Sequence, residues 1–487
     1  MSDPFPPGSF VSSDPLDWWR GGYEWLRCSA RMQELWTDRM GSAQARRNKR
    51  DARLVSLLAH ARSRSRFLAR HWSSAGPEAP LHALAPTTRG ELMAHFDDWV
   101  TDPEIRLDDV RRFVADPSRV GEAFLGRYAV WTSSGTTGVP GIYVQDEEAL
   151  AIYGALLGAQ ADFAPTTDPR SFMGRPARLA LVAATGGHFA GVVWWQRLCR
   201  MYPLLAAQAR VFSILEPLDA LCEALAAWNP TSIASYPTVL NQLAAEQRAG
   251  RVQLAPRTLL SGGEALCETE RLAIEKTFDC AVVEDYGASE CMNIAHSCSA
   301  HRLHVNQAWV VLEPVDEHMQ PVPPGESSFT VLVTNLANQV QPIVRYDLGD
   351  SVTIDPEPCE CGDERPTLRV SGRADDVLEF DAQHGEFVRV LPLAIETVLE
   401  EDSGLSRFQL TQIARDELQL RIELIDSHER QRAFDRAQKA LARFLSKQGV
   451  AKPVHLQLDD EAPQIDRRSG KLRRIRARTR GGTEPAS

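Results

Sequence analysis

The middle of the chain alternates between short apolar segments and segments whose apolar residues recur at helical spacing. The strand-like segments are residues 179–184, 211–214, 232–236, 258–261 and 281–284. The helical spacing occurs between them, in residues 192–201, 218–225 and 239–244. Such alternation is typical of parallel β-α-β units, whose ligands bind at the loops after the carboxyl ends of the strands. The sequence therefore predicts an α/β fold.

The two ends of the chain have a different pattern. Residues 16–75 are rich in Trp, Arg, Leu and Ala and predict helices. Beyond Asp375, residues 417–424 alternate strictly between polar and apolar, which predicts a half-buried strand. An amphipathic helix over 434–445 and a strand over 455–458 follow. We expect a large N-terminal domain, 1–374, built on β-α-β sheets, and a smaller, mobile α+β domain, 375–487.

Composition narrows the class of protein. With 487 residues, 43% of them hydrophobic, the chain can bury a large core, which excludes a disordered chain, a collagen-like fibre and a small disulfide scaffold. A net charge of −11 argues against a nucleic-acid partner. The longest uncharged apolar run, 179–195, is shorter than the roughly 20 residues that span a bilayer. Nine mostly scattered cysteines indicate a reducing compartment, so we expect a cytoplasmic protein without a membrane partner.

The sharpest local motif is TSSGTTGVPG, residues 132–141. Its glycines allow backbone amides to turn inward, and its five hydroxyls add donors, which suits phosphate oxygens. The stretch differs from a P-loop because no Lys follows Gly138. A Ser/Gly linker is the alternative.

Five further motifs follow in a fixed order. They are SGGE at 261–264, DYGASE at 285–290, RYDLGD at 345–350, GRADD at 372–376 and SGKLRR at 469–474. Each alone could be a glycine turn, an acidic loop or a basic tail. Together they resemble the adenylate-forming superfamily of acyl-CoA ligases, carrier-loading adenylation domains and luciferases. The chain is most similar to the phenylacetate–CoA ligase family, from about residue 50 to 476. The superfamily's glycine loop usually ends in Pro-Lys, whereas here it ends in Pro140-Gly141, as is common in the phenylacetate branch.

The resemblance implies a role for each motif. The phosphates of ATP would lie in the glycine loop, on Ser133, Ser134, Gly135, Thr136 and Gly138. The catalytic residues would be Thr137, Glu290 and Lys471. The rest of the nucleotide site would include Gly263, Glu264, Tyr286, Gly287, Asp350 and Arg373. Tyr286 would pack on adenine, Asp350 would bind the ribose, and Asp375 would be the hinge of the small domain.

The activity implied by the resemblance is activation of a carboxylic acid. Glu290 would bind Mg²⁺, a hard cation that prefers oxygen ligands. The acid, aryl or arylacetic, would react with ATP to give acyl-AMP, and the acyl group would pass to coenzyme A. Two alternatives stay open: transfer to a carrier-protein thiol or an amine, and an inactive homologue that acts as a binding subunit. A homodimer also stays open as the oligomeric state.

Two groups of residues could form the acyl pocket. Residues 186–189 with Trp194-Trp195, and Tyr236-Pro237, follow predicted strands, but helix packing explains the two Trp equally well and His188 alone is more often structural. A basic stretch, 467–480, holds eight Lys or Arg in fourteen residues. A solvated tail around Lys471 is favoured there over a nucleic-acid patch.

The last group has the residue types of a zinc site. Cys298, His304, Cys359 and Cys361 could give three thiolates and an imidazole, the set that suits one tetrahedral, structural Zn²⁺. Similar residues are common at these places in the phenylacetate–CoA ligase group. His296 and His301 are rival ligands, and unrelated thiols are the alternative.

Overall fold

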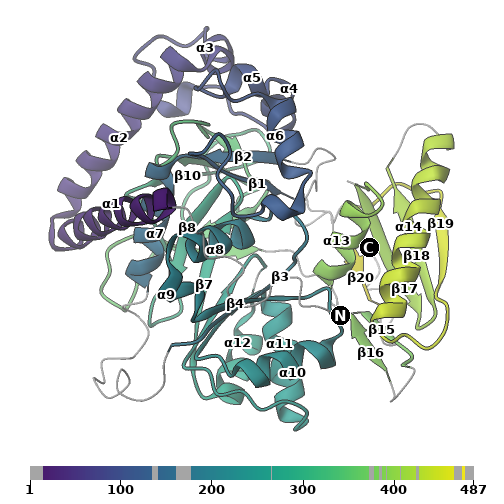
Figure 1. Ribbon diagram of the computed structural model, residues 1–487. Helices are drawn as coiled ribbons and strands as arrows, with labels where there is room; N and C mark the ends of the chain where they lie inside the picture. Colours follow the sequence, from purple (N-terminus) through teal and green to yellow (C-terminus); the bar gives the residue numbers. More distant parts are fainter. Residues whose placement is uncertain are drawn as a thin grey trace. The chain divides into compact units, whose positions relative to one another are not determined.

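The computed structural model describes most of the chain, namely residues 15–133, 141–160, 177–264, 266–371, 378–382, 387–390, 392–405, 407–423, 427–464 and 474–477. These residues form two compact units (Figure 1). The larger comprises 15–133, 141–212 and 225–371, and the smaller comprises the described residues from 378 onward together with Ser213–Ala224. The boundary predicted at Asp375 lies outside the described residues and stays a prediction.

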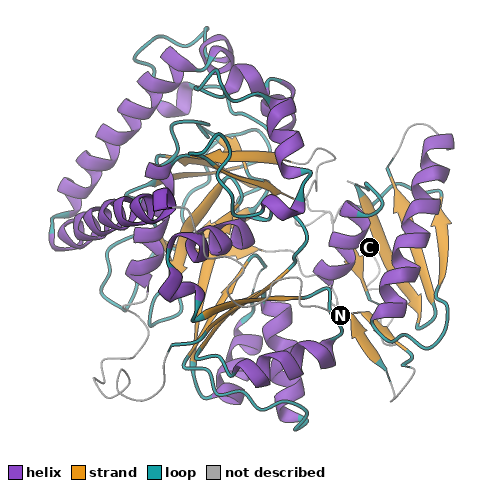
Figure 2. Ribbon diagram, viewed as in Figure 1, coloured by secondary structure: helices purple, strands orange, loops and turns teal. Residues whose placement is uncertain are grey.

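The N-terminal part of the large unit is helical, as predicted (Figure 2). Its helices are α1 (Pro15–Met40), α2 (Ala43–Arg64), α3 (Arg66–His71), η1 (Leu81–Ala83), α4 (Arg89–Ala94), α5 (Phe96–Trp99), α6 (Leu107–Val114) and η2 (Pro117–Arg119). Side-chain caps fix several of their starts. At α4, the Thr88 hydroxyl accepts from the amide of Glu91 while the Glu91 carboxylate accepts from the amide of Thr88, a capping box. This cap places Arg89 at the first position of α4.

The main sheet has nine strands in the order β13-β14-β9-β8-β7-β6-β5-β3-β4. Their bounds are β3 (Leu179–Ala183), β4 (Ala209–Ser213), β5 (Ser232–Ser235), β6 (Thr258–Gly262), β7 (Ala281–Ala288), β8 (Cys291–Ser297), β9 (Leu303–Val305), β13 (Ser351–Ile354) and β14 (Thr367–Ser371). Strands β3, β5, β6 and β7 pair in parallel, whereas β7 to β14 along the sheet pair antiparallel. The predicted α/β fold is confirmed, and β4 lies at the edge of the sheet beside β3.

Helices connect the parallel strands. They are α8 (Ala190–Met201), α9 (Pro203–Ala206), α10 (Leu218–Trp228), α11 (Pro237–Arg248) and α12 (Glu268–Phe278). Pro237 begins α11, where its missing N–H has no cost. Helix α11 packs against β6 and α12 against β7 (Figure 1).

Strand β7 differs from the prediction because it continues to Ala288, so Tyr286 and Gly287 lie within the strand. The cause is the hairpin with β8, in which Tyr286 pairs with Ala295 and Ala288 with Cys291. A side chain at Gly287 would put Cβ 1.7 Å from the carbonyl oxygen of Met292. Glycine is therefore required for this close pairing of β7 and β8.

Two smaller sheets complete the large unit. One is the hairpin of β1 (Ala129–Ser133) and β2 (Gly141–Gln145), followed by α7 (Glu147–Gln160). The other contains β10 (Val310–Val315), β11 (Thr330–Asn335) and β12 (Tyr346–Asp347). Trp131, Tyr143 and Tyr346 belong to the large hydrophobic core and are almost completely buried. Aromatic rings therefore bring β1, β2 and β12 into one core.

The small unit is α+β, as predicted (Figure 2). Its elements are β15 (Leu378–Phe380), β16 (Val388–Val390), α13 (Pro392–Glu401), β17 (Phe408–Ala414), β18 (Glu417–Ile422), α14 (Ser427–Lys447), β19 (His455–Asp459) and β20 (Ile475–Arg476). The alternating residues of β18 have Leu418, Leu420 and Ile422 buried, which gives the expected single wet face. None of the helices in the described ranges is both long enough and apolar enough to cross a lipid bilayer.

Candidate active site

Several predicted site residues lie where β5, β6 and β7 end. Because these strands are parallel, their carboxyl ends meet at one edge of the sheet. Tyr236 follows β5 and Gly263 follows β6 with φ +81°. A Cβ at Gly263 would lie 3.0 Å from the Tyr236 ring, so the ring lies directly over this glycine. Burial raises the pKa of Tyr236 to about 12, and its hydroxyl stays protonated at neutral pH.

The structure brings together Tyr286 and Asp350, which are far apart in the sequence. The Tyr286 hydroxyl donates a 3.0 Å hydrogen bond to Oδ2 of Asp350. Burial first, and then the charge of Asp350, raises the pKa of Tyr286 well above its usual range, so the phenol acts as a donor. The DYGASE and RYDLGD motifs therefore meet at one site.

Glu290 lies in the turn between β7 and β8 and is only 2% exposed. Its Oε1 accepts hydrogen bonds from the hydroxyls of Tyr143 and Tyr346, both at 2.6 Å. The Nη2 of Arg89 lies 3.2 Å from the same oxygen. Burial and the Glu290 charge raise the pKa of both phenols, which keeps them as donors to the carboxylate. The buried charge of Glu290 is thereby both paired and hydrogen-bonded.

The backbone around Glu290 is also fixed. The indole of Trp131 donates to the carbonyl oxygen of Ser289 at 2.8 Å. The side-chain amide of Asn335 donates to the carbonyl oxygen of Glu290 at 3.0 Å, and Asn335 itself is fully buried. The turn that carries Glu290 is therefore held by β1 and β11 as well as by its own hairpin.

The ends of the glycine loop are clamped by the β1–β2 hairpin. Ser133 pairs with Gly141, and the Ser133 hydroxyl accepts from the amide of Gly141 at 3.2 Å. The loop itself, with Ser134, Gly135, Thr136, Thr137 and Gly138, lies outside the described residues. So do Arg373, Asp375 and Lys471, whose roles stay predictions.

Two predicted residues have structural contacts. The Glu264 carboxylate accepts from the amide and the hydroxyl of Thr238, both at 3.1 Å, at the start of α11. His188 is 2% exposed, its Nε2 lies 3.1 Å from the carbonyl oxygen of Asp116, and its ring packs on Phe113. A structural role therefore explains His188 without a ligand.

Sequence reasoning missed the side chains around Glu290. Arg89 and Tyr143 belong to no motif that we singled out, and they are far from Glu290 along the chain. Tyr346 lies inside the RYDLGD motif, but we assigned it no role from the sequence. Arg345 just before it has φ +47°, a left-handed conformation uncommon for this residue type. Its guanidinium is held by Glu313 at 3.1 Å and by the carbonyl oxygen of His82 at 3.0 Å.

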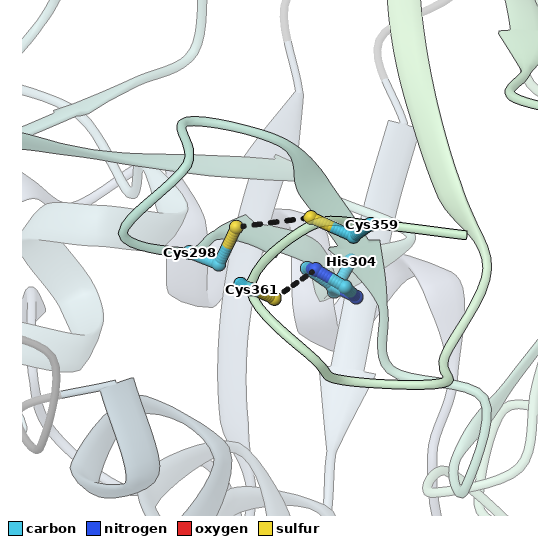
Figure 3. Close-up of side chains that lie close together, drawn as sticks. All are labelled: Cys298, His304, Cys359 and Cys361. Carbon is cyan, nitrogen blue, oxygen red and sulfur yellow. Dashed lines mark hydrogen bonds between the residues drawn. The ribbon is translucent and has the colours of Figure 1, made fainter. Parts of the chain in front are cut away.

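The four predicted zinc ligands come together in the large unit (Figure 3). Cys298 follows β8, His304 lies on β9, and Cys359 and Cys361 lie in the loop between β13 and β14. One ligand atom from each lies within 4.8 Å of all the others. The Sγ atoms of Cys298 and Cys359 are 3.6 Å apart, and Sγ of Cys361 is 3.3 Å from Nε2 of His304.

This geometry fits a tetrahedral cation. Zinc–sulfur bonds of about 2.3 Å would place two sulfurs about 3.8 Å apart, close to the observed spacing. Nδ1 of His304 lies 3.1 Å from the carbonyl oxygen of Arg365, the partner that commonly leaves Nε2 for a metal. Backbone amides of Ala300 and Asp363 approach the sulfurs of Cys298 and Cys361 at 3.3 and 3.5 Å.

The two rival histidines have other surroundings. His301 has its Nε2 3.9 Å from Glu275 on α12. His296 lies opposite His304 across the β8–β9 ladder, and its Nε2 is 3.4 Å from the guanidinium of Arg365. The ligand group that the structure assembles therefore contains His304 and neither rival.

Comparison with known proteins agrees with this site. Residues 127–327, which include Tyr143, Tyr286 and Glu290, match the family model described as AMP-binding enzyme. The resemblance to adenylate-forming enzymes is thereby confirmed. Protein CapK of Staphylococcus aureus is 26% identical over 168 residues, which cover 34% of this chain and 36% of CapK. A phenylacetate-coenzyme A ligase of Thermus thermophilus is 28% identical over 183 residues, 35% of this chain and 39% of the ligase. The chain thus spans less than two fifths of the length of these curated relatives.

Solved structures of 2-hydroxyisobutyryl-CoA ligase have a similar fold over nearly the whole chain. The postadenylation state with R3-HIB-AMP gives a TM-score of 0.52 at 21% identity and covers 91% of both chains. The thioesterification state with 2-HIB-AMP and CoA gives 0.55 at 20% identity and covers 90% of this chain and 91% of the ligase. The likeness confirms the fold class, a large N-terminal and a small C-terminal domain.

Proposed function

We propose that the protein activates a carboxylic acid with ATP as an acyl-AMP and then transfers the acyl group to the thiol of coenzyme A. The observation that carries this proposal is the meeting of Tyr286, Glu290 and Asp350 at one edge of the parallel sheet. Tyr286 and Asp350 share a hydrogen bond, and the Glu290 charge contributes to the raised pKa of Tyr286. Tyr286 and Asp350, from two of these motifs, are thus in direct contact, and the charge of Glu290 acts on Tyr286.

The proposed reaction has two steps, and in each step one bond forms while another breaks. A carboxylate oxygen attacks the α-phosphorus of ATP, and pyrophosphate leaves. The thiol sulfur then attacks the acyl carbon, and AMP leaves with the former carboxylate oxygen. Asp350 would bind the ribose hydroxyls, Lys471 would approach the α-phosphate, and Glu290 would hold Mg²⁺. Bound Mg²⁺ supplies positive charge to the phosphate oxygens.

An aryl or arylacetic acid is the substrate class that we propose. Phe189 and Tyr236, which follow β3 and β5, place aromatic rings at the end of the sheet where ligands bind, and both pack against the hydrophobic core. Aromatic walls favour a flat, apolar acyl group. We also propose that the small domain, 375–487, turns about Asp375 so that one site serves both half-reactions.

Pyrophosphate release over a set of aromatic and aliphatic acids tests the proposal. Acid-dependent release, followed by thioester only when coenzyme A is present, is the expected result. Release with no thioester, but with acyl transfer to a carrier protein or an amine, would favour the alternative acceptors. No acid-dependent release with any acid would favour a binding subunit and overturn the proposal.

We further infer that Cys298, His304, Cys359 and Cys361 hold one structural Zn²⁺. Four protein ligands leave no open position for a catalytic water, so the role would be to join the loops. The loop of Cys359 and Cys361 lies between the strand after Asp350 and β14, which leads toward Arg373. Zinc would therefore fasten this loop to the end of β8.

A further inference from the structure

Three segments that are distant in the sequence converge on one oxygen of Glu290. Tyr143 comes from β2, Tyr346 from β12 and Arg89 from the start of α4. Both tyrosine hydroxyls lie 2.6 Å from Oε1, and Nη2 of Arg89 lies 3.2 Å from it. The Arg89 Nε also lies 3.3 Å from the Tyr346 hydroxyl, which can donate to Glu290 while accepting from Arg89.

A carboxylate has about four acceptor positions on its two oxygens. Three donors on Oε1 fix the plane of the carboxylate, because each bond constrains the same oxygen from a different element. Magnesium requires a near-ideal octahedral arrangement at about 2.0–2.1 Å, so a ligand of fixed orientation is favoured.

We propose that Tyr143, Tyr346 and Arg89 are positioning residues that hold Oε1 of Glu290 and present Oε2 as the Mg²⁺ ligand. They act through Glu290 and bind neither the nucleotide nor the metal in this role. The inference rests on the proposed function, because it concerns the metal ligand of the ATP site.

Gly141 provides independent support. A Cβ built at Gly141 would lie 2.5 Å from the Tyr143 hydroxyl, 2.6 Å from Cε2 of that ring and 2.7 Å from Oγ of Ser133. In this chain the space next to residue 141 is taken by Tyr143, whose hydroxyl reaches Glu290. The absence of a side chain at 141 is therefore a condition for the Tyr143–Glu290 contact.

The test measures binding, so it does not depend on turnover. The probe is α,β-methylene-ATP, titrated by calorimetry with excess Mg²⁺ and again without added divalent cation. The variants are Tyr143→Phe, Tyr346→Phe and the double variant, each of which keeps the ring and removes only the hydroxyl. Loss of partners of a metal ligand typically weakens metal affinity by about 10- to 100-fold. We expect the double variant to bind the Mg²⁺-nucleotide about 10- to 100-fold more weakly and the metal-free nucleotide as the parent does.

Tyr128→Phe is the matched control. The Tyr128 hydroxyl donates to Oδ2 of Asp102 at 2.6 Å, so the same substitution removes an equally short tyrosine–carboxylate bond elsewhere in the large unit. A general loss of stability would affect this variant too, whereas a positioning role predicts parental binding of the Mg²⁺-nucleotide. Gly141→Ala, which should displace Tyr143, is expected to reproduce the loss if the double variant does not fold.

The outcomes separate this inference from the proposed function. Parental Mg²⁺-nucleotide affinity in a folded Tyr143→Phe/Tyr346→Phe protein and in Gly141→Ala would overturn the inference alone. Equal weakening with and without Mg²⁺ would also overturn it, because the residues would then support the nucleotide pocket in general. A parent protein that binds the nucleotide no better with Mg²⁺ than without it would overturn the inference and the ATP-dependent function together.

Discussion

The large unit contains two buried clusters of polar side chains, and they differ in whether the protein itself supplies partners for the charge. At Glu290, one acceptor oxygen is surrounded by three donors. At Cys298, His304, Cys359 and Cys361, soft ligand atoms face one another at 3.3 to 3.6 Å. The first cluster is stable without a cation because its charge is already paired with Arg89. In our proposal the second cluster holds a cation, which would offset the repulsion between thiolates that face each other.

The comparison indicates what each cluster contributes. In our proposal the Glu290 site holds a fixed carboxylate for a cation that arrives with the nucleotide, so we expect the loss of Glu290 to affect catalysis first. The cysteine cluster joins loops, so we expect its loss to affect folding first. The following predictions test this division, beginning with the largest expected effect.

Glu290→Gln keeps the size of the side chain and removes its charge. We expect pyrophosphate release to fall by about 100- to 1,000-fold, the usual cost of losing one electrostatic stabiliser of a transition state. The unfolding free energy should fall by about 1.5–3 kcal/mol, because Arg89 loses a charged partner. Glu284→Gln on β7, the strand that precedes this turn, is the control and should keep parental activity. Full activity of Glu290→Gln at ordinary Mg²⁺ would remove Glu290 from the catalytic site.

Lys471→Ala tests the positively charged side chain that we expect the small domain to contribute to catalysis, in addition to Glu290. We expect acyl-adenylate formation to fall by about 100-fold, since a charge directed at the transition state is lost. Thioester formation from a supplied acyl-adenylate should change far less, because the small domain would have turned Lys471 away. The two half-reactions are measured separately. Equal loss in both would contradict the two-state domain account.

Cys361→Ser tests the cation requirement of the second cluster. The purified parent should contain about one zinc per chain, and the variant should lose it and melt more than about 4 °C earlier. Cys267→Ser is the control: this exposed cysteine lies at the start of α12, outside the cluster, and the change should leave the zinc content unaltered. EDTA should lower the melting temperature of the parent by removing zinc, and it should leave the hydrogen bonds to Glu290 unchanged. A zinc-free parent of unchanged stability would contradict the assignment.

Glu284 gives the smallest expected effect and a direct contrast with Glu290. Burial raises the pKa of Glu284 to about 7, from 4.5, so the folded protein keeps a proton that the unfolded chain releases. The unfolding free energy should therefore fall as the pH rises from about 4.5 to about 7, by about 1–2 kcal/mol after solvent screening. Denaturant titrations near these two pH values should show this fall in the parent and not in Glu284→Gln. An equal fall in both proteins would assign it to another group.

The sequence predicted the parts of the molecule that depend on local pattern. Apolar spacing located β3, β5, β6 and β7 and the helices α8, α10 and α11, since period and burial are encoded within a few residues, whereas α12 was not predicted. The grouping of Cys298, His304, Cys359 and Cys361 was also predictable, because thiols and imidazoles are rare and chemically distinctive. Tyr286, Glu290 and Asp350 were found through motif resemblance and not through spacing.

The features that the sequence did not predict depend on contacts formed only in the folded protein. Arg89 reaches Glu290 from a helix start about two hundred residues earlier, and no local pattern encodes that distance. The extension of β7 to Ala288 depends on pairing with β8, which overrides the turn tendency of Gly287. Gly141 was predicted only as the end of the glycine loop, whereas in the structure a Cβ at this position would lie 2.5 Å from the Tyr143 hydroxyl.

The most direct test of acyl-adenylate formation follows the carboxylate oxygen. An acid labelled with oxygen-18 in its carboxylate is incubated with the protein, ATP, Mg²⁺ and coenzyme A, and the AMP is examined by mass spectrometry. Attack of the carboxylate on the α-phosphorus predicts AMP that carries one oxygen-18 atom for each thioester formed. Unlabelled AMP, or turnover that yields ADP and phosphate, would contradict the account.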